Sequence, residues 1–305
     1  MGIGMYHKII DNFPVIQSYF TGVNRVSDSG KNSPAKLPEL KADVFEKSKD
    51  IKAPELNELS RLFPNNEIYK IFDDIVKEYG LENPPSLEYI CNSDDNDFAS
   101  ASHISNKITL NLDNILTPNI YKFLVEKDGK KTYCKNEMAK SLRTLKTTNQ
   151  ADINTITDYY LQSGADKCSA EPLSDEDKRK MIIFSLAHEL EHFYQNQVVR
   201  HTEGLDEFDM IKTQLSRNSD IKENILEQLK QKYESNYGEK DKSKIYSQDS
   251  PEGKLAQEWY QASINYTDYN EDYETYANNP LEADANNRAN KYLTEHFGDF
   301  TFEIN

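Results

Sequence analysis

Apolar residues recur three or four positions apart in several parts of this chain, which is the spacing of one face of an α-helix. The first such stretch covers residues 54–80, where Pro64 interrupts the pattern and Gly80 ends it. Proline lacks the N–H that a helix interior needs, and glycine suits the left-handed conformation that closes many helices. We therefore expect an interrupted helix here. The same spacing predicts further helices over residues 136–146, 152–162 and 219–234.

The pattern changes to alternation of apolar and polar residues between residues 86 and 134, which is typical of β-strands. Asp128-Gly129 separates two alternating stretches and predicts a tight hairpin. Together with the helices, these strands predict an α+β fold that is mostly helical, with a small mixed or antiparallel sheet. Three more strands are expected over residues 87–91, 99–103 and 107–112.

One predicted helix differs from the others because it is apolar around most of its circumference. It begins at Ser174, and the acidic residues Asp175-Glu176-Asp177 form its expected first turn. A helix that is apolar on all sides is buried in the protein. The apolar residues that follow the start are Met181, Ile182, Ile183, Phe184, Leu186, Leu190 and Phe193.

This buried helix carries the sequence His188-Glu189-Leu190-Glu191-His192. Two histidines four positions apart lie on one face of a helix, so both imidazoles can reach one metal ion. Glu189 lies about 100° around the helix from His188, where a carboxylate can act as general base toward a metal-activated water. The pattern predicts a catalytic metal centre. The alternative is a pair of hydrogen-bonded core histidines beside surface carboxylates.

Glu191 departs from the stricter form of this motif, which has uncharged residues between the glutamate and the second histidine. A buried carboxylate is costly unless it is paired. We therefore expect Glu191 to face solvent or a cation.

A catalytic zinc site needs a third protein ligand and an open position for water. One class of zinc protease places Gly and His shortly after the motif, but here those positions hold Gln195 and Val198. That class is excluded. His201 lies more than two helical turns beyond His192 and reaches the metal only if the chain turns back. The histidines outside the motif are His7, His103, His201 and His296.

Glu282 is the stronger candidate for the third ligand. Pro280 suits the first position of a helix and Asn279 suits its cap, so Glu282 falls in the first helical turn. Asp284 is an alternative ligand, and either Asp284 or Asn286 can orient a histidine ligand from behind. A simpler explanation of Glu282 is a carboxylate placed at a helix N-terminus by the helix dipole.

The H-E-L-x-H motif, followed by a helix that begins Pro-x-Glu-Ala-Asp, resembles the gluzincin-type metallopeptidases. The compact members, which include phage-repressor-cleaving and stress-response proteases, are the most similar. The resemblance covers two helical stretches and one strand. It implies a zincin-like fold in which His188, His192 and Glu282 bind one Zn²⁺ and Glu189 is the catalytic base. It also implies that Ile108–Asn111 is an edge strand above the active-site helix, where a substrate backbone pairs; an ordinary sheet strand is the alternative.

Zinc peptidases need a hydrogen-bond donor that stabilises the oxyanion formed during hydrolysis. Several tyrosines precede Glu282, and Tyr273 and Tyr276 are the nearest candidates for this catalytic role, followed by His201. Tyr269 lies at helical spacing from both tyrosines, so an aromatic packing stripe is the alternative.

Composition narrows the choice of partners and compartment. The chain has 305 residues and a net charge of −16, which argues against nucleic acid or an anionic membrane as partner. Cys91, Cys134 and Cys168 are far apart and include no C-x-x-C, so they form neither a disulfide framework nor a thiolate zinc site. No apolar run approaches the ~18 residues of a membrane span, and the N-terminus lacks the features of a secretory signal. We expect a cytoplasmic protein, or one exported without a cleavable signal.

The sequence thus predicts a zinc metalloendopeptidase that acts on a protein or peptide substrate. Residues 1–52 have the composition of a flexible arm and linker, and 53–305 form the metallopeptidase domain, with a charged helical insertion around 203–250. Two other classes remain open: a zinc-binding protein without activity, and a metal-free helical interaction protein. The arm is compatible with delivery of the protein as an effector or toxin.

Overall fold

The structure is a computed structural model. The predictions for the arm over 1–52, for a helix over 136–146 and for Tyr273 lie outside the residues that it describes. The described residues are 53–91, 98–116, 121–134, 150–218, 223–237, 244–267, 275–276 and 278–298.

The N-terminal part of the described chain is a broken helix followed by a sheet. The predicted break at Pro64 is confirmed, because a short 3₁₀ turn over Pro64–Asn66 separates two α-helices. Gly80 ends the second helix in the left-handed conformation, with φ 67°. The elements are α3 (Ala53–Leu62), α4 (Glu67–Tyr79), β1 (Ser86–Ile90), β2 (Ala99–Ser102) and β3 (Lys107–Asn111).

The first sheet is mixed, with strand order β1-β3-β2. β3 pairs in parallel with β1 and antiparallel with β2. The expectation that Ile108–Asn111 is an edge strand is therefore wrong, because β3 is central. Alternation along β3 showed which side chains are buried, and Ile108 and Leu110 are fully buried, but alternation carries no information on strand order. β1 and β2 are the two edge strands of this sheet among the described strands, and β2 packs against the helix that carries the motif.

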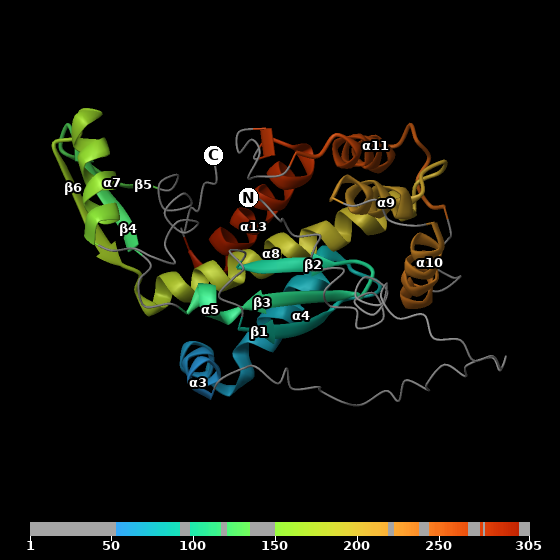
Figure 1. The fold of residues 1–305 in the computed structure, drawn as a ribbon, viewed down its shortest axis with the longest axis horizontal. Coiled ribbons are helices and arrows are strands. Elements are labelled where there is room, and N and C mark those ends of the chain that lie inside the picture. The colour runs from blue at the N-terminus through green and yellow to red at the C-terminus, as the bar shows by residue number, and fades with distance from the viewer. Residues whose placement is uncertain are drawn as a thin grey trace, which may run out of the picture.

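A second, antiparallel sheet has the order β5-β4-β6 and lies to one side with helix α7 (Figure 1). The predicted hairpin is confirmed, since Asp128 and Gly129 both have positive φ, 52° and 72°. Strand β6, which was not predicted, leads directly into the motif helix. The elements are α5 (Leu112–Ile115), β4 (Tyr121–Lys127), β5 (Lys130–Cys134), α7 (Gln150–Gln162) and β6 (Lys167–Pro172).

Helix α8 (Asp175–Arg200) carries the motif and runs through the middle of the molecule (Figure 1). Its predicted start is confirmed: the Ser174 hydroxyl accepts from the Asp177 N–H, and the Asp177 carboxylate accepts from the Ser174 N–H. This reciprocal pair satisfies two N–H groups that a helix start otherwise leaves without partners. Lys122 of β4 donates to Asp177 at 2.8 Å and so ties the second sheet to this end of α8.

The C-terminal part of the chain packs helices on and around α8. The predicted start of α13 is confirmed, because Pro280 opens the helix and the Asn279 side chain accepts from the Leu281 N–H. α13, α11 and α4 all pack against α8. The remaining elements are α9 (Glu207–Asn218), α10 (Glu223–Tyr237), α11 (Pro251–Ile264) and α13 (Pro280–Phe297).

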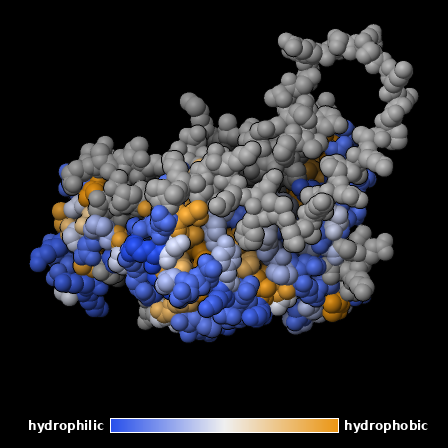
Figure 2. Space-filling view, turned by 90° about the horizontal axis from the view of Figure 1, so that it is seen from below, coloured by the Kyte–Doolittle hydropathy of each residue, from blue (hydrophilic) through white to orange (hydrophobic). Residues whose placement is uncertain are grey.

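The largest hydrophobic cluster joins α3, α4, the first sheet, α8 and α13, and a second cluster joins α9 and α10 to Ile104. The described part is thus α+β and mostly helical, as predicted. None of its helices combines the length and apolarity that a membrane crossing requires. Figure 2 shows a face on which hydrophilic side chains predominate among the coloured residues.

Candidate metal centre and its cavity

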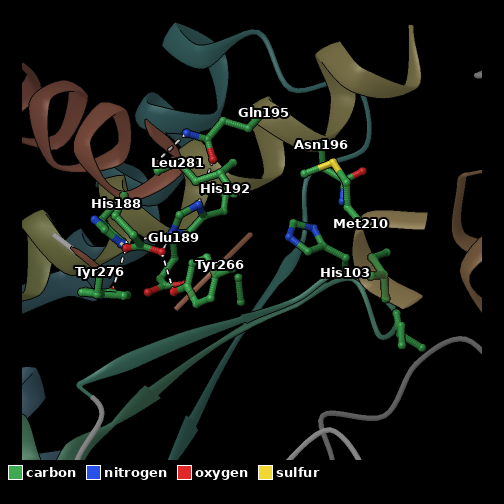
Figure 3. A pocket seen from close by; sticks show the side chains of 14 residues that line it. His103, His188, Glu189, His192, Gln195, Asn196, Met210, Tyr266, Tyr276 and Leu281 are labelled. Atoms are coloured by element: carbon green, nitrogen blue, oxygen red, sulfur yellow. Dashed lines mark hydrogen bonds and ion pairs between the residues drawn. The ribbon is translucent and has the colours of Figure 1, made fainter. Parts of the chain in front are cut away.

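Three side chains with metal-binding atoms converge between α8 and α13 (Figure 3). His188 and His192 lie one turn apart on α8, with their Nε2 atoms 3.1 Å from each other. The Glu282 carboxylate, from the first turn of α13, lies 3.4 Å from His188 Nε2 and 3.7 Å from His192 Nε2. All three ligand atoms lie within 4.8 Å of one another. Two helices far apart in the sequence thus supply one small group of donors.

The tautomer of His192 follows from its neighbour Gln195. The Gln195 amide nitrogen donates to the Leu281 carbonyl at 2.9 Å, so the amide oxygen must face the opposite way. That oxygen lies 2.9 Å from His192 Nδ1, and since it only accepts, Nδ1 carries the proton. In this tautomer, a neutral ring presents a lone pair at Nε2. This is the state in which histidine binds a metal.

His188 is held in the same way by α13. Its Nδ1 lies 2.9 Å from the Asn286 amide oxygen, so its Nε2 also presents a lone pair. With both rings neutral in this tautomer, the two Nε2 lone pairs would face each other at 3.1 Å and repel each other. A cation between them removes this repulsion, so the donor set fits a metal ion and fits zinc in particular. Asn286 takes the orienting position that was predicted for Asp284 or Asn286.

Glu282 is buried, with 3% of its surface exposed. Its two oxygens accept from the hydroxyls of Tyr266 at 2.8 Å and Tyr276 at 2.7 Å. Burial by itself raises the pKa of Glu282, but His192, His188 and the Tyr276 hydroxyl outweigh it and lower the pKa to about 2. The carboxylate is therefore ionised at neutral pH and available to a cation.

The other residues considered at the sequence level lie in different places. Asp284 accepts from the Trp259 indole N–H at 2.8 Å and is not part of the ligand group. His201 caps the far end of α8 and lies 3.1 Å from Glu82, so it is not part of the group either. The Tyr276 hydroxyl faces Glu282, and a role in catalysis stays a prediction.

Glu191 faces a cation, which is one of the two surroundings expected for it. Its side chain is only 3% exposed, and Arg288 Nη1 donates to it at 2.7 Å. The Arg288 guanidinium lies between the rings of Tyr79 and Tyr194, 3.9 and 4.2 Å from their centroids. Burial raises the pKa of Glu191, and Arg288 opposes that effect. This pair lies apart from the ligand group and joins α8 to α13.

A cavity of about 90 Å³ opens beside the ligand group (Figure 3). Glu189, which is 8% exposed, lines this cavity together with His188 and His192. A carboxylate in this place can take a proton from a molecule in the cavity and return it to another atom. Ile104, Met210 and Ile211 contribute apolar side chains to the cavity lining.

Sequence reasoning missed three residues of this site. Gln195 was detectable, since it lies on the same helix one turn after His192. Tyr266 and His103 were not, because no periodicity links them to the motif. His103 reaches the cavity from the turn between β2 and β3.

Comparison of the chain with protein-family models, with curated proteins and with solved structures gives no match in any of the three. The chemistry of the site therefore rests on the residues themselves.

Proposed function

We propose that this chain is a zinc-dependent metallopeptidase of zincin type, with the ligand set of the gluzincins, that hydrolyses peptide bonds in a protein substrate. The observation that carries the proposal is the convergence of two histidines and one buried glutamate beside a cavity lined by Glu189. Structural zinc sites commonly have four protein ligands, whereas catalytic sites have three. Three ligand atoms meet here among the described residues.

One Zn²⁺ would be held by His188, His192 and Glu282. It would lower the pKa of a bound water to about 7 and polarise the scissile carbonyl. Glu189 accepts the proton of the attacking water and then delivers it to the leaving amine. Gln195 and Asn286 keep the two imidazoles in the ligand tautomer throughout.

The two described tyrosines at the site serve Glu282 in this proposal. Both hydroxyls donate to its carboxylate, which fixes the third ligand and leaves its negative charge partly balanced. We retain Tyr273 and Tyr276 as candidate donors to the oxyanion.

The position of β2 supports a peptide as substrate. β2 packs against α8 and has a free edge among the described strands, and Ala101 at its end lines the cavity. An extended peptide pairs readily with such an edge. We therefore propose that the substrate backbone pairs with β2 rather than with Ile108–Asn111.

The first test is the metal content of the purified protein, measured by elemental mass spectrometry after dialysis. We expect about one zinc per chain in the wild type and a strong loss in Glu282→Ala, because the remaining two ligands bind weakly. Asp284→Ala is the matched control on the same helix and should keep its zinc. A wild type that binds no metal even after zinc is added would contradict the proposal and favour a helical interaction protein.

Activity then separates a peptidase from a zinc-binding protein without catalysis. Glu189→Gln should keep the metal, because Glu189 is not a ligand, and should lose nearly all hydrolysis of a peptide library. If the wild type holds zinc but leaves every peptide of the library intact, the non-catalytic zinc protein is the better description.

A further inference from the structure

His103 is a polar residue of the cavity wall for which the proposed mechanism has no use. It follows β2 and packs against Phe193 with the rings tilted by 54° and their centroids 4.6 Å apart. Phe193 is the residue next to His192, so His103 lies beside the ligand group without belonging to it. Figure 3 shows its ring extending from the turn toward His192.

The position of His103 is fixed by α10 through its backbone. The Tyr237 hydroxyl donates to the His103 carbonyl at 3.4 Å, and the Asn236 amide donates to the carbonyl of Ile104 at 2.8 Å. The same hydroxyl lies 3.3 Å from the Asn106 amide oxygen, so the two acceptors share its proton. α10 thus holds the backbone of the turn between β2 and β3, and the His103 ring lines the cavity from this turn.

The ring itself has unmet hydrogen-bonding capacity. Its Nδ1 is enclosed and has no hydrogen-bond partner in the part of the chain that the structure describes. Burial lowers the pKa of His103 to about 3, so the ring is neutral and has one donor and one acceptor. Buried polar groups are nearly always paired, and one that is not needs an explanation.

The enclosure of Nδ1 indicates which nitrogen carries the proton. An enclosed N–H without an acceptor is rarer in proteins than an enclosed acceptor without a donor. The tautomer protonated at Nε2 therefore fits best, and it directs an N–H from the far edge of the ring toward the cavity. Of the other polar groups there, His188, His192, Tyr266 and Tyr276 already have partners.

We propose that His103 is a substrate-binding residue whose Nε2–H donates a hydrogen bond to a backbone carbonyl oxygen of the bound peptide. The apolar side chains of Ile104, Met210 and Ile211 then face the side chain of the same peptide segment. Every peptide has backbone carbonyl oxygens, whatever its sequence. His103 therefore recognises the peptide backbone rather than a particular side chain. The inference rests on the proposed function.

The test compares three variants on a peptide that the wild type cleaves. In His103→Gln, the amide nitrogen takes the place of Nε2, whereas Asn is too short to reach it and Leu has no donor. We expect KM to rise about tenfold in His103→Leu and His103→Asn, with kcat nearly unchanged, because a uniform binding contact is lost. In His103→Gln, KM should stay within about threefold of the wild type.

Zinc content and melting temperature are measured for every variant, with His296→Leu as the control for a histidine remote from the cavity. An unchanged KM in His103→Leu would overturn the inference while the peptidase proposal stands. An equal rise of KM in the Gln and Leu variants, or loss of zinc from His103→Leu, would overturn it too, in favour of a packing or ligand-supporting role. A wild type that holds zinc and cleaves no peptide would contradict both the proposed peptidase function and the proposed role of His103.

Discussion

Two amide side chains, rather than carboxylates, hold the imidazoles of this site. Gln195 and Asn286 each accept from an Nδ1–H through a neutral oxygen at 2.9 Å. A carboxylate in either place would make the ring more basic and add a negative charge. With amides, the only ionised group of the ligand set is Glu282. A divalent ion would then leave the centre with a net positive charge, which favours the polarisation of a carbonyl.

At the scale of single residues, Gln195 offers a prediction on metal affinity. Gln195→Ala removes the acceptor that orients His192 and the donor that holds the Leu281 carbonyl next to Glu282. We expect zinc affinity to fall about 10–100-fold, measured by competition with a chelator. Gln197→Ala is the matched control, since that side chain bonds Gly80 and Glu82 instead. An affinity of Gln195→Ala within twofold of the wild type would contradict this role.

At the scale of elements, the start of α8 combines three interactions at one carboxylate. Asp177 accepts from the Ser174 N–H at 3.0 Å, from the Ser174 hydroxyl at 2.7 Å and from Lys122 at 2.8 Å. Burial opposes ionisation of Asp177, but the hydrogen bonds from Lys122 and Ser174 outweigh it, so the pKa of Asp177 lies below its ordinary value. A group with a lowered pKa stabilises the folded state above its unfolded pKa and loses that effect as the pH falls through the folded value.

Asp177→Asn should therefore destabilise the protein in a pH-dependent way. At pH 7 we expect the free energy of unfolding to drop by about 1–2 kcal/mol, since the capping bond weakens and the partly buried pair with Lys122 is lost. The difference from the wild type should shrink as the pH falls below about 4. Urea denaturation of the metal-free wild type and the metal-free Asp177→Asn variant at several pH values measures this difference in the free energy of unfolding.

Asp175→Asn serves as the control in the same helical turn. Asp175 pairs with Arg61 at the surface, and its side chain is 56% exposed. Exposed pairs contribute little, so its removal should change stability much less. A constant difference between wild type and Asp177→Asn across the pH range would show that ionisation of Asp177 does not matter.

Elements were predictable from the sequence where local chemistry decides them. The capped start of α8, the Pro280 start of α13 and the Asp128-Gly129 hairpin all depend on a few adjacent residues. Helix α9 was missed although Phe208, Ile211 and Leu215 recur at helical spacing, because the charged residues around them dominate the composition. The order of strands was not predictable, since the parallel pairing of β1 with β3 depends on contacts across a crossover.

At the scale of the whole molecule, the site residues differ in how much of the chain determines their position. His188, Glu189 and His192 follow from helical periodicity alone. Glu282 was named from the helix start at Asn279-Pro280 and then from the motif resemblance, and its contact with the histidines depends on the packing of α13 on α8. His103 depends on the packing of α10 on a turn, which no local pattern encodes.

The net charge of −16 gives the whole molecule a negative electrostatic field. A field of one sign attracts substrates of the opposite charge and accelerates their association. We expect kcat/KM for a peptide with lysines flanking the cleaved segment to exceed that of its glutamate-flanked counterpart by about tenfold at low ionic strength. The two values should converge in high salt, where charges are screened beyond about 3 Å at 1 M. Equal values at low salt would show that the molecule's field does not reach the cavity.

The hydrogen bond between Trp259 and Asp284 places a fluorescent side chain close to the proposed metal site. Trp259 is the only tryptophan in the chain, so its fluorescence belongs to one known position. Its indole N–H bonds the residue two places after Glu282, and its ring lies against Tyr194, 6.3 Å between centroids. If the proposed metal is bound, a shift of the first turn of α13 on ion binding would change the surroundings of this indole. Its emission would then follow ion uptake and release in real time, without a label.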